Sequence, residues 1–406
     1  MASEIRAAAI DEKVSQPRHV GNVALIILCQ SLQALVYGGI ALFLPLIRND
    51  LALSFTQAGA IGAASTVIYA LMQIPSGYLA DRVAAKRLFL FGLIGTNLLA
   101  FTFAQLHSYH FILINQALSG FFRSLLFAPG LLLITALFPN HRRATAMGLY
   151  VAGGFSSNVF LNTFGPLLVS QIGWRGLFSA FSAGGMLIVS LYWRFGSLGP
   201  PGSNMPPVPI REVLALFRYR HLWMIGAIQY VRLSVVSGLS FWLPTFLVVE
   251  KGYSLQVAGL LVAISAAVTA PSNFFGGYVS DRLRNPLLVI AASLTMLAIT
   301  TVLLVHVHTL ALLLVVFVVN GIFVQFYFGP LFAVSIQMLG SRRAGLATGC
   351  GNFFANLGGV TFTYLLGAIR DATGSFTVGL YTLSALCLLG LVCTDALSRM
   401  KPIDSP

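Results

Sequence analysis

Long apolar runs separated by short polar links make up most of the chain. A helix needs about 20 apolar residues to cross the hydrocarbon core of a membrane, and twelve runs reach roughly that length. Most charged residues lie in the links. The pattern predicts an all-α membrane protein with transmembrane helices near residues 22–47, 55–80, 88–106, 109–138, 143–170, 174–193, 221–249, 255–280, 287–306, 309–339, 343–369 and 375–396.

Composition leaves little room for a soluble domain. Of 406 residues, 57% are hydrophobic and 9% are charged, and the mean hydropathy is +0.86. The first apolar run is too long for the apolar core of a cleaved signal peptide and follows a segment of mixed charge, so we expect it to remain as the first helix. Apart from the short links between helices, only a tail at 1–21, a link at 194–220 and a tail at 397–406 lie outside the predicted helices. Binding chemistry must therefore lie inside a lipid-embedded bundle.

The net charge of +13 follows the predicted topology. If the N-terminus is cytoplasmic, eighteen Lys and Arg residues fall in the inner links and tails, and only Arg48, Arg175, Lys251 and Arg370 fall in the outer links. This asymmetry is the positive-inside rule. We therefore expect a multi-pass protein with both termini cytoplasmic, in the cell inner membrane because no organelle signal is present, and no nucleic-acid partner.

The sequence offers no motif for a metal, a cofactor or an enzyme. All four cysteines lie within apolar runs and lack the CxxC spacing of metal sites, and no carboxylate or cysteine accompanies the histidines near helix ends. Neither a Gly-x-x-x-x-Gly-Lys-(Ser/Thr) phosphate loop nor an HExxH motif occurs. We expect no metal, no cofactor and no enzymatic or ATP-driven activity.

An internal repeat with an offset of 200 residues divides the chain. "PSGYLADRVAAKR", which contains Asp81 and Arg82, corresponds to "FGGYVSDRLRN", which contains Asp281 and Arg282. "NHRRATAMG" likewise corresponds to "GSRRAGLATG". The Pro/Gly-rich segment 196–209 cannot be a helix interior and separates the copies. The repeat predicts two pseudo-symmetric six-helix bundles, residues 22–193 and 221–396, a plan known among secondary transporters.

The repeated loop resembles the signature Gly-x-Leu-(Ala/Ser)-Asp-Arg-x-Gly-(Arg/Lys)-(Arg/Lys) of the major facilitator superfamily, although Ala84 and Ala85 depart from it. "GWRGLF" at 173–178 is similar to that family's entry to helix 6. The resemblance, closest in character to organic-anion carriers, implies gating roles for Asp81, Arg82, Asp281 and Arg282. It also implies a central cavity lined by helices 1, 4, 7 and 10 and braced by helices 2, 5, 8 and 11.

Two charged residues lie at mid-depth on those cavity helices, Arg123 in "SGFFRSLLFAPG" and Arg232 in "QYVRLSVVSG". A charge inside a membrane is costly unless it faces water or a partner. All eleven Asp and Glu residues fall in tails, links or helix ends, so no embedded carboxylate is available. Because a guanidinium offers a forked set of donors that suits carboxylate or phosphate, the pair indicates a site for an external anion. Bonds of Arg123 to backbone carbonyls and snorkelling of Arg232 are the structural alternative.

Uncharged donors accompany the two arginines. Gln30, Gln33 and Tyr37 share one face of the first helix, since residues three or four apart lie on the same side. Each alone also fits a packing hydrogen bond between helices. The side chains that we expect to bind substrate with the arginines are Gln30, Gln33, Tyr37, Gln229, Gln325 and Tyr327.

These features favour a secondary active or facilitative transporter, by symport or antiport, of a small organic anion, either a carboxylate or a phosphorylated metabolite. An amino-acid carrier is an alternative, because an embedded arginine also binds the carboxylate of a zwitterion. A proton-coupled multidrug exporter is disfavoured, because helix 5 keeps only the Gly-Pro of the exporter motif and no acid lies in the bundle. A non-transporting sensor lacks an attached signalling domain. We expect a monomer that uses a proton, if any ion, for coupling.

Overall fold

The structure is a computed structural model that describes residues 2–139, 142–197, 217–339 and 344–401. All regular structure in these ranges is helical. The first group of helices comprises α1 (Ala2–Leu42), α2 (Leu44–Asp50), α3 (Phe55–Arg82), α4 (Ala85–Gln105), α5 (Tyr109–Ala136) and α6 (Arg143–Phe195). The second comprises α8 (Arg220–Val249), α9 (Leu255–Leu283), α10 (Pro286–His306), α11 (Leu310–Phe326), α12 (Phe328–Leu339), α13 (Ala344–Thr373) and α14 (Thr377–Ser398).

The all-α membrane fold predicted from the apolar runs is confirmed. Within the described residues, ten helices are long and apolar enough to cross a membrane. One of them, α6, bends at Gly173, which has φ 67°, so it supplies two of the predicted spans. The 30-residue α13 is the remaining one. The prediction of twelve spans therefore accounts for every long helix described.

Several boundaries differ from the sequence-based expectation. Helix α1 begins at Ala2, so most of the expected tail 1–21 continues the first helix. The predicted span 22–47 is broken at Phe43, and the separate α2 begins at Leu44 with Pro45, which lacks an N–H, in its first turn. The expected link 194–220 falls mainly on residues 198–216, and the expected tail 397–406 includes residues 402–406, both outside the described residues.

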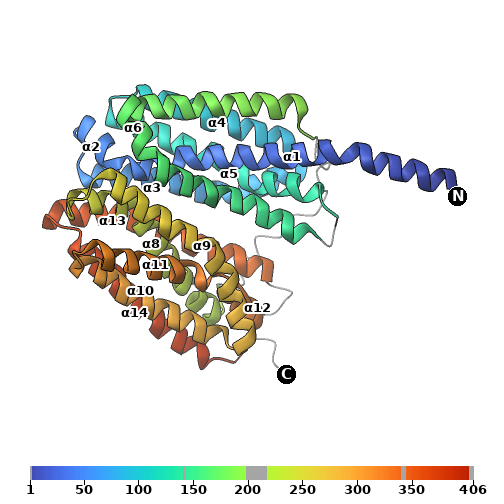
Figure 1. Ribbon diagram of the computed structural model, residues 1–406. Helices are drawn as coiled ribbons and strands as arrows, with labels where there is room; N and C mark the ends of the chain where they lie inside the picture. Colours follow the sequence, from blue (N-terminus) through green and yellow to red (C-terminus); the bar gives the residue numbers. More distant parts are fainter. Residues whose placement is uncertain (1, 140–141, 198–216, 340–343, 402–406) are drawn as a thin grey trace.

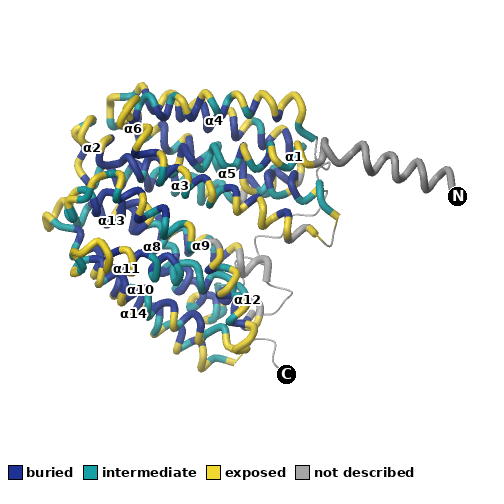
Figure 2. The backbone as a smooth tube through the Cα atoms, in the orientation of Figure 1, coloured by how far each residue is buried: buried dark blue, intermediate teal, exposed yellow. Residues whose placement is uncertain are grey.

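The helices form two groups that lie side by side (Figure 1), the N-half (α1–α6) and the C-half (α8–α14). The start of α1 and the end of α14 lie at the same end of the bundle, here called the terminus end, and the opposite end is called the far end. Buried residues lie inside each half, and exposed residues cover much of the outside (Figure 2). Many of these exposed residues are large and apolar, as expected for a surface that faces lipid.

The halves contact each other through α3 against α13 and α6 against α9. Near the far end these contacts are close enough to require glycine: a Cβ on Gly59 would lie 2.8 Å from the carbonyl oxygen of Thr363, and one on Gly259 would overlap the carbonyl oxygen of Asn162. At the terminus end, a Cβ on Gly77 or on Gly277 would meet no described atom within 4 Å. The halves are therefore tightly packed at the far end and separated at the terminus end.

Candidate substrate-binding site

A cavity of about 330 Å³ lies between the two halves. The N-half contributes residues of α1 and α6, and the C-half contributes residues of α8, α9, α11 and α13. The polar residues of its wall are all uncharged: Tyr37, Asn158, Asn162, Ser237, Ser240, Ser265, Thr269, Asn320, Gln325 and Thr363. Such a wall can exchange hydrogen bonds with the hydroxyl or carboxylate groups of a substrate.

Arg123 lies behind this cavity, midway along α5. Its Nη1 donates a hydrogen bond of 3.0 Å to Ser65 Oγ on α3. The guanidinium carbon lies 3.6 Å from the ring centre of Tyr37 and 5.2 Å from that of Tyr69. Aromatic rings stabilise a guanidinium through its face, which leaves the N–H groups at its edge free to donate. Nε has no hydrogen-bond partner among the described residues.

Tyr37 separates Arg123 from the central cavity. It lines the central cavity and also a small cavity of about 10 Å³ within the N-half, whose wall includes Arg123, Gln33 and Gln116. The small cavity has room for about one water. The side chain of Tyr37 is 40% exposed, so it presents itself to the central cavity while its ring covers the guanidinium. A substrate in the central cavity therefore meets Tyr37 before Arg123.

Arg232 occupies a different environment. It is 5% exposed, its Nε donates to Gln229 Oε1 at 3.0 Å, and its guanidinium carbon lies 5.0 Å from the ring centre of Phe328. It lines neither of the two cavities. Within the described part of the chain, the hydrogen bonds and ring contacts of each arginine stay inside its own half. The structure does not bring the two guanidiniums onto one wall.

The uncharged candidates are distributed over both environments. Gln33 lies with Arg123, whereas Gln30 accepts a hydrogen bond of 2.9 Å from the Tyr150 hydroxyl. Gln325 lines the central cavity, and its Oε1 is buried without a hydrogen-bond partner in the described residues. The Tyr327 hydroxyl is also buried without a partner there. Because an unpaired buried acceptor is costly, the Gln325 oxygen is suited to accept a hydrogen bond from water or substrate.

The predicted gating residues lie at the terminus end. The guanidinium carbon of Arg82 is 4.0 Å from the ring centre of Tyr78, and Nη1 of Arg282 donates to the Tyr278 hydroxyl at 3.4 Å. The two contacts occupy positions related by the repeat. Asp281 is exposed, and the side chain of Asp81 is outside the described residues.

The sequence reasoning missed two polar positions of the cavity wall on α6, Asn158 and Asn162. They are four residues apart and therefore share one helix face, and the Asn162 amide donates to the Asn158 carbonyl oxygen at 2.7 Å. The spacing is visible in "SSNVFLN", but the family resemblance implies a bracing role for this helix. Ser265 and Thr269 on α9, also four residues apart, line the cavity from the C-half.

Two six-helix halves around a central cavity, with a half-buried arginine beside it, define a multi-pass membrane carrier. Sequence comparison supplies the family: the profile of the Major Facilitator Superfamily matches residues 26–363 and 252–397, and the chain belongs to that superfamily. It is accordingly a secondary transporter and not an enzyme.

Relatives and solved structures agree with this assignment. The nitrite extrusion protein of Bacillus subtilis (strain 168) is 25% identical over 363 residues, 85% of this chain and 86% of that protein. The probable galactarate/D-glucarate transporter GarP of Escherichia coli (strain K12) is 26% identical over 392 residues, 86% of this chain and 87% of that protein. The crystal structure of a bacterial homolog to the human lysosomal transporter Spinster, inward-facing and occupied, has a TM-score of 0.81 at 18% identity and covers 95% of this chain and 98% of that chain. The last likeness shows the fold.

Proposed function

We propose that this transporter carries a small organic anion by alternating access and that Arg123 binds the negative group. The observation that carries the proposal is the environment of Arg123. Its guanidinium lies at mid-depth beside the cavity, and no carboxylate pairs with it among the described residues. An anion in the plane of the guanidinium can accept bonds from its edge while the tyrosine rings cover its faces.

The size of the central cavity supports an organic substrate. Its volume of about 330 Å³ exceeds several times the roughly 30 Å³ that one water occupies in the liquid. A triatomic ion would leave most of this space to water. The names of the relatives support an anion: nitrite is a small inorganic anion, and galactarate and D-glucarate are hydroxylated dicarboxylates. The uncharged amides and hydroxyls of the wall suit the hydroxylated body of such a molecule.

Arg232 is the second proposed anion-binding residue, together with Gln229 and Tyr327 beside it in the C-half. A buried guanidinium without a carboxylate partner keeps an uncompensated charge, and in the described residues Arg232 has only a neutral amide and an aromatic ring. Gln30, Gln33, Tyr37 and Gln325 complete the proposed site. Arg82, Arg282 and the two aspartates of the repeated loop are proposed to gate the terminus end.

We propose cytoplasmic termini and a location in the inner membrane on the basis of the charge asymmetry. In that orientation the packed far end faces outside, and the structure represents an inward-facing conformation. None of the carboxylates whose side chains are described lines either cavity. A coupling proton would therefore bind to the substrate or to groups at the ends of the bundle.

The test is uptake of radiolabelled glucarate by proteoliposomes, with unlabelled glucarate, nitrite, an amino acid and a lipophilic cation as competitors. Arg123→Ala should abolish uptake, and Arg123→Lys should reduce it strongly because a lysine lacks the forked donors. Arg218→Ala, a change at an exposed arginine, is the matched control and should leave uptake unchanged. Full uptake by Arg123→Ala would exclude the proposed site, and competition by the cation alone would favour an exporter.

A further inference from the structure

The N-terminus of α3 has an unusually complete set of hydrogen-bond acceptors. The first four N–H groups of a helix have no partner within the helix. Here Ser54 and Gln57 form a capping box, in which Ser54 N–H donates to Gln57 Oε1 at 3.0 Å and Gln57 N–H donates to Ser54 Oγ at 3.1 Å. The two N–H groups between them, of Phe55 and Thr56, donate to Asp371, at 3.1 Å and 2.7 Å.

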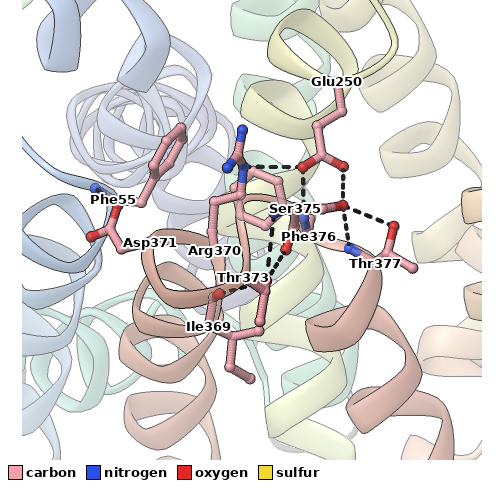
Figure 3. Close-up of polar contacts among 9 residues, drawn as sticks. All are labelled: Phe55, Glu250, Ile369, Arg370, Asp371, Thr373, Ser375, Phe376 and Thr377. Carbon is pink, nitrogen blue, oxygen red and sulfur yellow. Dashed lines mark hydrogen bonds and ion pairs between the residues drawn. The ribbon is translucent and has the colours of Figure 1, made fainter.

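Asp371 belongs to the other half of the protein. It lies in the last turn of α13, and its carboxylate points toward the start of α3 at Phe55 (Figure 3). The Thr56 hydroxyl donates a further hydrogen bond of 2.6 Å to the same carboxylate. A negative charge is also favourable at the positive end of the helix dipole. One side chain of the C-half thus caps a helix of the N-half at the far end.

Charged groups surround the contact between Asp371 and α3. Its neighbour Arg370 forms an ion pair of 3.0 Å with Glu250, which also accepts the N–H of Phe376 at 2.6 Å (Figure 3). Glu250 therefore fixes the link between α13 and α14. On the N-half side, the guanidinium carbon of Arg48 lies 4.0 Å from the ring centre of Phe55, and that of Arg370 lies 4.8 Å from it.

The repeat supplies an internal comparison. The counterpart of α3 is α9, which also begins after a serine, and Ser254 Oγ accepts from the Val257 N–H at 3.3 Å. No side chain in the described residues accepts from the two N–H groups between them. Gln171 stands at the position of Asp371, and it is exposed and makes no side-chain hydrogen bond in those ranges. The carboxylate cap is thus present on only one of the two faces that close the far end.

We propose that Asp371 is a latch that holds the far end of the transporter shut by capping α3 across the interface between the halves. Alternating access requires α3 and α13 to separate at this end. Separation removes the three hydrogen bonds to Asp371 and returns the N–H groups of Phe55 and Thr56 to water. The contact therefore exists in one conformation only, which is the condition for a group that biases the equilibrium between two conformations.

The inference rests on the alternating-access part of the proposed function but not on the identity of the substrate. Its test therefore uses the protein without substrate, so it can fail or succeed independently of the anion site. Spin labels are attached to introduced cysteines. The pair Ser108→Cys and Val378→Cys lies at exposed positions on opposite halves at the far end, and the pair Met147→Cys and Leu283→Cys lies at the terminus end. Cys393 is replaced by Ser, and the other three cysteines are buried. Distances are measured by double electron–electron resonance in nanodiscs.

Asp371→Ala should lengthen the far-end distances and shorten the terminus-end distances, with about a fivefold rise in the far-end-open population, as the loss of a typical helix cap implies. Asp371→Glu should restore much of the original distance distribution. Asp371→Asn keeps the shape but loses the charge, so its distribution should lie between those of Asp371→Ala and the unmodified protein. Gln171→Ala is the matched control and should change nothing. Distributions that are identical in Asp371→Ala and the unmodified protein, with both folded by thermal unfolding, would overturn the latch.

Discussion

Gly59, in the second turn of α3, lies where that helix packs closely against α13 at the far end. A Cβ at this position would lie 2.8 Å from the carbonyl oxygen of Thr363, 3.1 Å from that of Tyr364 and 3.2 Å from the Trp242 ring. Ordinary van der Waals contact begins at 3.4 Å. Gly59→Ala must therefore move the two backbones apart by about 0.6 Å, the difference between 2.8 Å and 3.4 Å.

The energetic consequence differs between the two conformations. Overpacking of this kind costs about 1–3 kcal/mol. Replacement of glycine by alanine also stabilises a helix interior by up to about 1 kcal/mol, but that gain is the same in both conformations and cancels in their ratio. The steric cost applies only while the far end is closed. Gly59→Ala should therefore raise the ratio of far-end-open to far-end-closed protein by about 5- to 150-fold.

Trp242 reports this change directly. It is 2% exposed, donates from Nε1 to the Thr363 carbonyl oxygen at 2.9 Å, and packs against Phe55 of the other half. With the other three tryptophans replaced by Phe, acrylamide should quench Trp242 fluorescence several times more strongly in Gly59→Ala. Gly184→Ala, where no described atom lies within 4 Å of the added Cβ, is the control. Equal quenching in Gly59→Ala and Gly184→Ala would refute the argument from close packing.

Two further predictions concern pH and backbone conformation. Burial by itself raises the pKa of the Asp371 carboxyl, but the hydrogen bonds from the first turn of α3 lower the pKa more, to below its ordinary value of 3.8. The group is thus charged over the physiological range, and its contribution to closure is lost only as the pH falls through the lowered pKa. The far-end spin-label distances should be constant from about pH 8 to about pH 5 and lengthen below about pH 4, and a change near neutral pH would assign the effect to another group. Gly173 has φ 67° and ψ 168°, a conformation that essentially only glycine adopts, and a Cβ there would meet no described atom within 4 Å. Gly173→Ala should therefore lower the free energy of unfolding by about 1–3 kcal/mol through backbone strain alone, and an unfolding temperature as high as that of Gly184→Ala would contradict this.

The helices were predictable from the sequence because their cause is local. The ends of α3, α4, α5 and α8 lie within three residues of the predicted spans, since a run of apolar residues ends where charged or turn-forming residues begin. The break at Gly173 was also visible, because the two spans around it were separated in the prediction. The continuation of α1 to Ala2 was not predicted, because apolarity was the criterion and that segment carries charges.

The positions of the arginines were only partly predictable. Helical spacing shows which residues share a face, but it does not show how far a helix is rotated toward a cavity. Gln33, Tyr37 and Arg123 do lie together, as their mid-depth positions on neighbouring helices suggest. Arg232 is turned toward Gln229 and Phe328 inside its own half. This direction depends on packing between helices that are distant in the sequence.

Asp371 shows the same limit more sharply. The sequence predicts that Asp371 lies in an outer link, where a single carboxylate does not indicate any particular contact or function. Its meaning comes from the N–H groups of residues more than 300 positions away. The repeat then makes the contact informative, because Ser54 and Ser254 match while Asp371 and Gln171 do not.

Two places where the halves differ in charge also have proposed roles in transport. Arg123 has no charged counterpart in the C-half, where the aligned region offers Val324 and Gln325, and Asp371 has a neutral counterpart in the N-half. A carrier built from two identical halves would bind an asymmetric molecule equally in two opposite orientations and would close equally on both sides of its far end. A charge placed in one half makes the two substrate orientations unequal. A cap placed on one interface makes the two sides of the far end unequal. The proposed anion-binding role of Arg123 and the proposed latch role of Asp371 thus rest on the same feature, a charge present in one copy of a repeated framework and absent from the other.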